Sequence, residues 1–195
     1  MQPHLIVPGW RGSGPDHWQT HWERALPNAT RLDVPDWHVP RKHDWLRALD
    51  EAIHRLAAPP IVIAHSLGCL AVAHWAASTT HPVRGALLVA PVDLDRAECP
   101  GPLRDFGAAP RARLPFFTRV VASDDDPYAT LGRVQQMAAA WGAQLTVLHH
   151  AGHINVESGF GPWHEGRIWI DRIAEAKEPI RPEAIPARLE QNRVS

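Results

Sequence analysis

Residues 61–68 read IVIAHSLG, and this stretch decides the fold class. Its first four residues are apolar without polar alternation, which is typical of a strand covered on both faces of a parallel sheet. Ser66 follows almost at once, and residues 69–75 (CLAVAHW) continue as a helix-forming run. A serine on a sharp strand-to-helix turn, flanked by the small residues Ala64 and Gly68, is typical of a nucleophile elbow. The stretch therefore predicts an α/β fold with a reactive serine at the end of a central strand.

The elbow alone leaves a second interpretation open, since serine is also among the best helix N-caps. A nucleophilic serine needs a base and an orienting carboxylate, expected in the chain order Ser, Asp or Glu, His. The apolar run 118–123 is followed by Asp124-Asp125-Asp126-Pro127, and the run 144–149 is followed closely by Gly152-His153. Carboxyl ends of parallel strands share one edge of a sheet, where α/β proteins bind ligands. The order predicts Ser66, His153 and one of the three aspartates as a catalytic triad.

Short apolar runs alternate with helix-period stretches along the chain, which indicates βαβ units and a parallel sheet. Strands are expected near residues 4–8, 30–34, 60–64, 83–90, 118–123 and 144–149. Helices are expected near residues 16–26, 42–57, 67–79, 130–141 and 163–177. Residues 91–117 hold five prolines and are expected to be mostly loop with one short helix at most. A chain of 195 residues fits a single domain, placed at 1–177, with a proline- and charge-rich tail at 178–195.

Composition excludes several classes of function. Lys plus Arg is 20 and Asp plus Glu is 21, so the formal net charge of −1 argues against a polybasic nucleic-acid binder. The apolar runs are too short for a membrane span, and the N-terminus lacks the basic start of a signal peptide. Two cysteines, Cys69 and Cys99, make no disulfide framework, so a cytoplasmic location is expected.

Four blocks of this sequence resemble the small α/β-hydrolase-fold serine hydrolases related to retinoblastoma-binding protein nine. These blocks are residues 8–19 (PGWRGSGPDHWQ), 64–68 (AHSLG), 122–128 (ASDDDPY) and 152–163 (GHINVESGFGPW). The resemblance covers nearly the whole chain. One departure is His164, since the residue after the tryptophan is usually proline in such a family. The resemblance implies a three-layer minimal α/β-hydrolase fold, with a mostly parallel central sheet of about six strands and helices on both faces.

The resemblance also assigns roles within the site. The family's acid stands just before a proline, which maps onto Asp126, with Asp125 as the next candidate. The oxyanion hole would use the backbone N–H of Leu67, the residue after the nucleophile, and that of Trp10, the matching position in the first block. No metal or organic cofactor is implied. The family's retinoblastoma contact does not carry over, because the nearest match to L-x-C-x-E, residues 67–71, lacks the glutamate and lies within the elbow helix.

Other residues favour plainer interpretations. His17 and His21 have metal-ligand spacing on a helix, but no third ligand is visible and tryptophan replaces the glutamate of a zincin. Cys69 is expected to be a buried helix residue, and His65 to hydrogen-bond locally. Most of the nine tryptophans are expected to pack in the core, with Trp10 as the exception.

The sequence thus predicts a serine hydrolase that cleaves small carboxylic esters or related acyl compounds. A thioesterase or an amide or peptidase-like hydrolase would use the same residues. A binding protein on a hydrolase fold is the alternative from another class. The short interval 91–117 can form a flap but no cap domain, so short acyl groups are expected. Leu94, Leu103, Phe106, Leu114, Phe116 and Phe117, with Trp10 opposite, are candidates for an apolar pocket wall or for packing of this connection onto the sheet.

Overall fold

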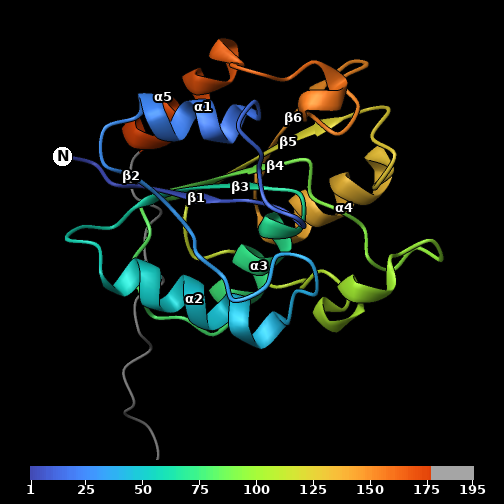
Figure 1. The fold of residues 1–195 in the computed structure, drawn as a ribbon, viewed down its shortest axis with the longest axis horizontal. Helices are drawn as coiled ribbons and strands as arrows, with labels where there is room; N and C mark the ends of the chain where they lie inside the picture. Colours follow the sequence, from blue (N-terminus) through green and yellow to red (C-terminus); the bar gives the residue numbers. More distant parts are fainter. Residues whose placement is uncertain (177–195) are drawn as a thin grey trace, which may run out of the picture.

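A computed structural model describes residues 1–176 of the chain (Figure 1). Its centre is a six-stranded sheet in the order β2-β1-β3-β4-β5-β6, and every neighbouring pair runs parallel. The strands are β1 (His4–Val7), β2 (Ala29–Arg31), β3 (Ile61–His65), β4 (Gly85–Val89), β5 (Thr118–Ser123) and β6 (Gln144–Leu148). The predicted parallel α/β sheet is confirmed.

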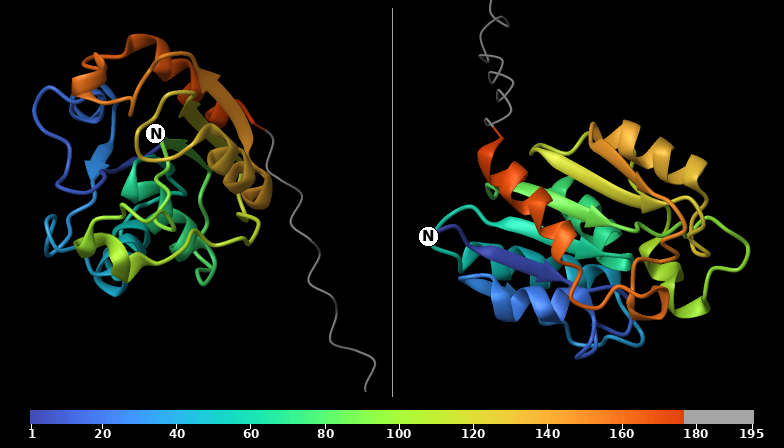
Figure 2. Two further views of the ribbon diagram at one scale, coloured as in Figure 1. Left: turned by 90° about the vertical axis from the view of Figure 1, so that its right-hand side faces the viewer. Right: turned by 90° about the horizontal axis from the view of Figure 1, so that it is seen from above.

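Within residues 1–176, five α-helices cover the two faces of this sheet, which gives the predicted three layers (Figures 1 and 2). One face carries α1 (Trp18–Ala25) and α5 (Ile168–Glu175). The other face carries α2 (Lys42–His54), α3 (Leu67–Ala76) and α4 (Leu131–Trp141). Each connection between neighbouring parallel strands thus returns through a helix or a long loop, as parallel pairing requires.

Burial explains why the apolar runs form strands. Every residue of β3 and β4 is buried, so neither strand needs polar alternation. Two hydrophobic cores flank the sheet. On one side Trp18 and Trp22 of α1 pack with Ile173 of α5, and on the other Trp45 and Leu49 of α2 pack against α3. The tryptophans therefore serve mainly as core residues, as expected.

Element boundaries differ modestly from the sequence prediction. The edge strand β2 ends at Arg31, although the next residue, Leu32, still donates its N–H to Ile6 O of β1 at 2.8 Å. The last helix begins as a 3₁₀ turn, His164–Arg167, before α5. Within residues 91–117 the short helix is a 3₁₀ turn at Gly101–Phe106. The predicted tail, 178–195, lies outside the described residues. No helix among residues 1–176 has both the length and the apolar character needed to cross a membrane.

Candidate active site

The turn from β3 into α3 holds Ser66 in an unusual backbone conformation. Its φ is 56° and its ψ is −123°, a backbone conformation that residues other than glycine rarely adopt. The turn needs small neighbours because the chain segments nearly touch there. A Cβ added at Gly9 would lie 2.7 Å from Ser66 Cβ, and one at Gly68 would lie 2.5 Å from Val7 O. The predicted strand–turn–helix geometry is therefore present, and it presents Ser66 at the end of a central strand.

Three side chains from three loops meet at this point. His153 Nε2 lies 3.0 Å from Ser66 Oγ, within hydrogen-bond distance. On the opposite side of the same ring, Nδ1 lies 3.0 Å and 2.9 Å from the two carboxylate oxygens of Asp126. The Asp126 side chain is 3% exposed and the His153 side chain 9%. A carboxylate at Nδ1 favours the tautomer with its proton on Nδ1, so that Nε2 can accept the serine proton.

The three consecutive aspartates have different partners in the structure. Asp126 faces His153, whereas Asp125 accepts hydrogen bonds from Ser123 Oγ at 2.6 Å and from the Gly152 N–H at 2.8 Å. Asp124 accepts the His150 N–H at 2.9 Å. These bonds lower the pKa of Asp125, chiefly through the Ser123 hydroxyl, and that of Asp124, chiefly through the His150 N–H. Of the three aspartates, Asp126 is the one in contact with the imidazole, and its two neighbours fasten the loop that carries His153.

The loop around His153 is fixed by side chains that the sequence analysis did not single out. Ser158 Oγ accepts the His153 N–H at 3.1 Å and itself donates to Asn155 Oδ1 at 3.0 Å. The indole of Trp18, in α1, donates to Ile154 O at 2.9 Å. The Asn155-x-x-Ser158 spacing is a local side-chain-to-backbone motif that could have been found in the sequence. The bond from Trp18 spans the fold and leaves no local signal.

Two further histidines lie beside His153. The ring of His65 is 4.8 Å from that of His153 and 4.9 Å from that of His17, measured between centroids. His65 Nε2 lies 2.9 Å from His153 O, so the expectation of a local hydrogen bond is wrong: the partner is 88 residues away. Burial lowers the pKa of His65 well below its usual value. Burial, followed by the charges of Arg31 and His153, lowers the pKa of His17 to about 4.

A cavity of about 320 Å³ opens beside Ser66 and His153. Trp10 and Leu94 line it together with Leu103, and His17 reaches it from the start of α1. The remaining candidates for a pocket wall pack in the core instead: Phe106, Leu114, Phe116 and Phe117. Apolar residues from 91–117 therefore form part of the wall, while the aromatic residues of this interval attach the connection to the sheet.

The backbone N–H groups of Trp10 and Leu67 have no acceptor among the described residues, and neither do those of their neighbours Gly9 and Gly68. By contrast, the Arg11 N–H donates to Trp37 O at 2.9 Å and the Gly12 N–H to Gly9 O at 3.0 Å. Leu67 is the first residue of α3, where a helix leaves N–H groups unsatisfied. The indole of Trp10 donates to His38 O at 2.9 Å, which fixes the side chain of this loop residue.

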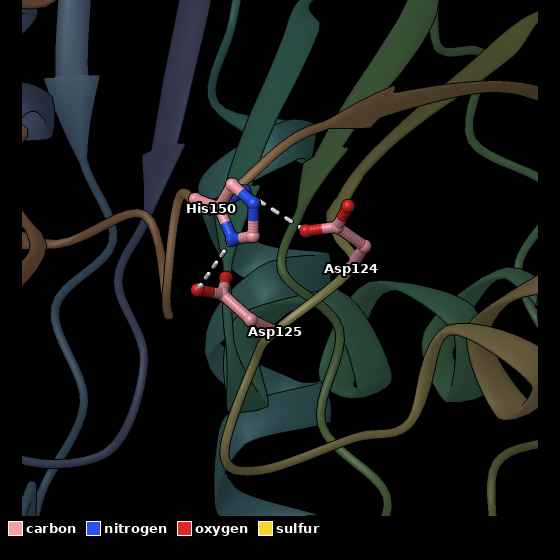
Figure 3. Close-up of side chains that lie close together, drawn as sticks. All are labelled: Asp124, Asp125 and His150. Atoms are coloured by element: carbon pink, nitrogen blue, oxygen red, sulfur yellow. Dashed lines mark hydrogen bonds and ion pairs between the residues drawn. The ribbon is translucent and has the colours of Figure 1, made fainter.

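Other candidate ligands and nucleophiles are placed elsewhere. Asp124, Asp125 and His150 gather on the surface with ligand atoms within 4.8 Å of one another (Figure 3). Both carboxylates already accept backbone N–H groups, and all three residues are exposed.

His17 and Cys69 have structural contacts that account for them. His17 Nδ1 accepts the Gln19 N–H at 3.1 Å and so caps α1. Cys69 is fully buried, its thiol donates to Val89 O at 3.3 Å, and burial raises its pKa well above the usual value.

Comparisons with known proteins agree with this fold. A family model described as serine hydrolase matches residues 4–172. The crystal structure of a YdeN-like protein from Pectobacterium atrosepticum SCRI1043, named as a hydrolase, superposes with a TM-score of 0.82 at 33% identity, over 92% of this chain and 94% of that one.

YdeN of Bacillus subtilis strain 168, also named as a hydrolase, is 27% identical over 168 residues, which are 80% of this chain and 87% of YdeN. Its crystal structure superposes with a TM-score of 0.72 at 22% identity, over 89% of this chain and 98% of that one. The expected likeness to small serine hydrolases is confirmed, and because the family model spans most of its length, the chain belongs to the serine hydrolase family.

Proposed function

We propose that this serine hydrolase cleaves small carboxylic esters or related acyl compounds, with Ser66 as nucleophile, His153 as base and Asp126 as the orienting acid. The observation that carries the proposal is the continuous contact from Ser66 Oγ through the His153 ring to the Asp126 carboxylate, at 3.0 Å and 2.9 Å. Ser66 and His153 line the cavity, so a substrate bound there can reach the hydroxyl.

The reaction proceeds in two halves. Ser66 Oγ attacks the acyl carbonyl while His153 Nε2 takes its proton, and the Asp126 carboxylate stabilises the resulting imidazolium. His153 then gives this proton to the departing alcohol oxygen, which leaves Ser66 acylated. A water molecule then attacks the acyl carbon while His153 takes its proton; the bond from the acyl carbon to Ser66 Oγ breaks, His153 returns the proton to Oγ, and the carboxylic acid is released. No step requires a metal ion or an organic cofactor.

The oxyanion of each tetrahedral intermediate accepts hydrogen bonds from the backbone N–H groups of Leu67 and Trp10. Their lack of an acceptor within the described part of the chain supports this assignment. Loss of one such donor typically lowers kcat by about 10²–10³. Gly9 precedes Trp10 and packs directly on Ser66, so the loop of residues 8–10 (the oxyanion loop) has a fixed position relative to the nucleophile.

Thioesters and activated amides would react through the same groups. Comparing kcat/KM for an ester, a thioester and an amide of the same acyl group tests the proposed preference for esters. The cavity volume of about 320 Å³ favours a short acyl chain. A protein that bound ligands without turning them over would have no use for an assembled base and acid. Both cysteines are free and buried, which fits the reducing environment of the cytoplasm.

Covalent labelling with a fluorophosphonate probe tests the proposal. Wild type should be labelled at one serine and should hydrolyse p-nitrophenyl acetate, whereas Ser66→Ala should lose both properties. Ser78→Ala is a matched control, because it removes an exposed hydroxyl just beyond the end of α3. Labelling of Ser66→Ala as strong as that of wild type would refute the assignment of the nucleophile.

A further inference from the structure

His65 and Ser66 are consecutive in the chain, and both contact the same distant residue. Ser66 Oγ lies 3.0 Å from His153 Nε2, and His65 Nε2 lies 2.9 Å from the His153 backbone oxygen. The positive φ of Ser66 turns the chain between the two side chains. One dipeptide therefore contacts both ends of the proposed base.

The state of His65 follows from its surroundings. Its ring is buried, and burial holds its pKa well below the usual value, so the ring is neutral and carries a single N–H. Because His153 O can only accept, that proton is on Nε2. A charged neighbour at 4.8 Å would oppose the imidazolium that His153 must form during the reaction, and a neutral N–H donor does not.

The loop that carries His153 (residues 150–158, the base loop) has other hydrogen bonds, but these do not connect it to the strand that carries Ser66. Side chains of Asp125 and Ser158 accept the N–H groups of Gly152 and His153, and Trp18 donates to Ile154 O. These bonds attach the loop to its own surroundings, namely the aspartate loop, the loop itself and α1. The bond from His65 joins the base loop to the strand that carries the nucleophile.

We propose that His65 is a positioning residue that sets the distance between nucleophile and base, by holding the His153 carbonyl from the residue next to Ser66. The inference rests on the proposed function, because it takes His153 as the base. It assigns no contact with substrate to His65. Since a misplacement of about 1 Å in a catalytic group can cost about 100-fold in rate, losing this bond should lower kcat and leave substrate binding unchanged.

Three substitutions at one position, with a control elsewhere, test this role. His65→Gln places an amide N–H at about the reach of Nε2, whereas His65→Asn is too short to reach the carbonyl. We expect His65→Ala and His65→Asn to lower kcat about 10- to 100-fold with KM within about twofold of wild type, and His65→Gln to regain most of the loss. His4→Ala is the matched control: His4 is also buried, and its ring Nδ1 bonds a backbone carbonyl, Pro27 O at 3.1 Å, at the start of β1. It should lower the melting temperature without lowering kcat.

Amide hydrogen exchange gives a second measurement that needs no turnover. Exchange in residues 150–158 should speed up in His65→Ala and His65→Asn but not in His65→Gln or His4→Ala. Equal kcat values for the Gln and Asn variants, or unchanged exchange in this segment, would overturn the inference, even if His65→Ala fails to fold. A wild-type protein that neither hydrolyses esters nor reacts with the fluorophosphonate would instead refute the proposed function, while the exchange data would still decide whether His65 holds the loop.

Discussion

Replacing Gly68 with alanine should push the nucleophile helix away from the strand that leads into the oxyanion loop. A Cβ at this position would lie 2.5 Å from Val7 O and 2.6 Å from Pro8 O. Ordinary van der Waals contact begins at 3.4 Å, so the helix and the end of β1 must separate by about 0.9 Å. Both obstructing atoms are backbone, which cannot swing aside as the end of a flexible side chain could. The displaced peptide groups directly precede Gly9 and Trp10.

The size of the effect follows from this geometry. Overpacking of a tight contact costs about 1–3 kcal/mol, and the better helix propensity of alanine offsets up to about 1 kcal/mol of it. With that offset the net loss is about 0–2 kcal/mol, so for a chain of this length the melting temperature should fall by at most about 8 °C. The catalytic loss should be larger, about 100-fold in kcat/KM, because the proposed Trp10 donor moves relative to Ser66.

The assay compares melting temperature and p-nitrophenyl acetate hydrolysis in two glycine variants. Gly132→Ala is the control, since Gly132 is an exposed residue of α4 with nothing within 4 Å of an added Cβ. It should keep wild-type activity and raise the melting temperature by about 1–4 °C, through helix propensity alone. Wild-type kcat/KM in Gly68→Ala would refute the reasoning that this close approach fixes the oxyanion loop.

Three further predictions concern the site. Asp126→Asn should lower kcat by about 10⁴, because an amide favours the wrong tautomer of His153, whereas Asp125→Asn should lower kcat far less. If steady-state kinetics gave the opposite ranking, the acid would be Asp125. The free energy of unfolding should fall as pH is lowered from 6.5 toward 4. Unfolded His17 takes up a proton in this range, whereas folded His17, with its pKa at about 4, does not. This difference in pKa between the two states corresponds to roughly 3 kcal/mol of stability. Melting curves should show a shallower decline for His17→Ser, which keeps a helix cap, and an unchanged decline would contradict this account. Among p-nitrophenyl esters from acetate to palmitate, kcat/KM should be highest for short acyl chains, so a steady rise toward palmitate would exclude the small cavity as the acyl site.

Much of the fold could be predicted because the sheet is parallel and covered on both faces. Runs such as residues 61–64 need no alternation of apolar and polar side chains when both faces are buried, and they stand out between helix-period stretches. Glycines and prolines separate these segments along the chain, so the order of strands and helices could be predicted even where their boundaries were off by a few residues. The three proposed catalytic residues could be suggested for a related reason: each stands within five residues of the end of a strand, and strand ends share one edge.

What holds those residues in place could not be predicted in the same way. The family resemblance singles out Asp126, which faces the imidazole, but no pattern in the sequence indicates that Asp125 accepts the N–H of Gly152 in the next loop. The bonds from Trp18 and His65 join elements far apart in the chain, and side chains of these types are also ordinary core residues. The aromatic residues of 91–117 were ambiguous for the same reason, since apolar side chains suit a pocket wall and a core equally well.

The wall of the cavity has a consequence for how such an enzyme can diversify. Leu94 and Leu103 come from the connection between β4 and β5, which contains none of the three proposed catalytic residues. The same connection also supports the loop of the proposed acid, because the Arg96 guanidinium donates to Pro127 O and the Asp93 N–H donates to Tyr128 O at 3.1 Å. New substrates can therefore be sought by randomising Leu94 and Leu103, which leaves these contacts in place, with fluorophosphonate labelling as the check that the reactive centre survives.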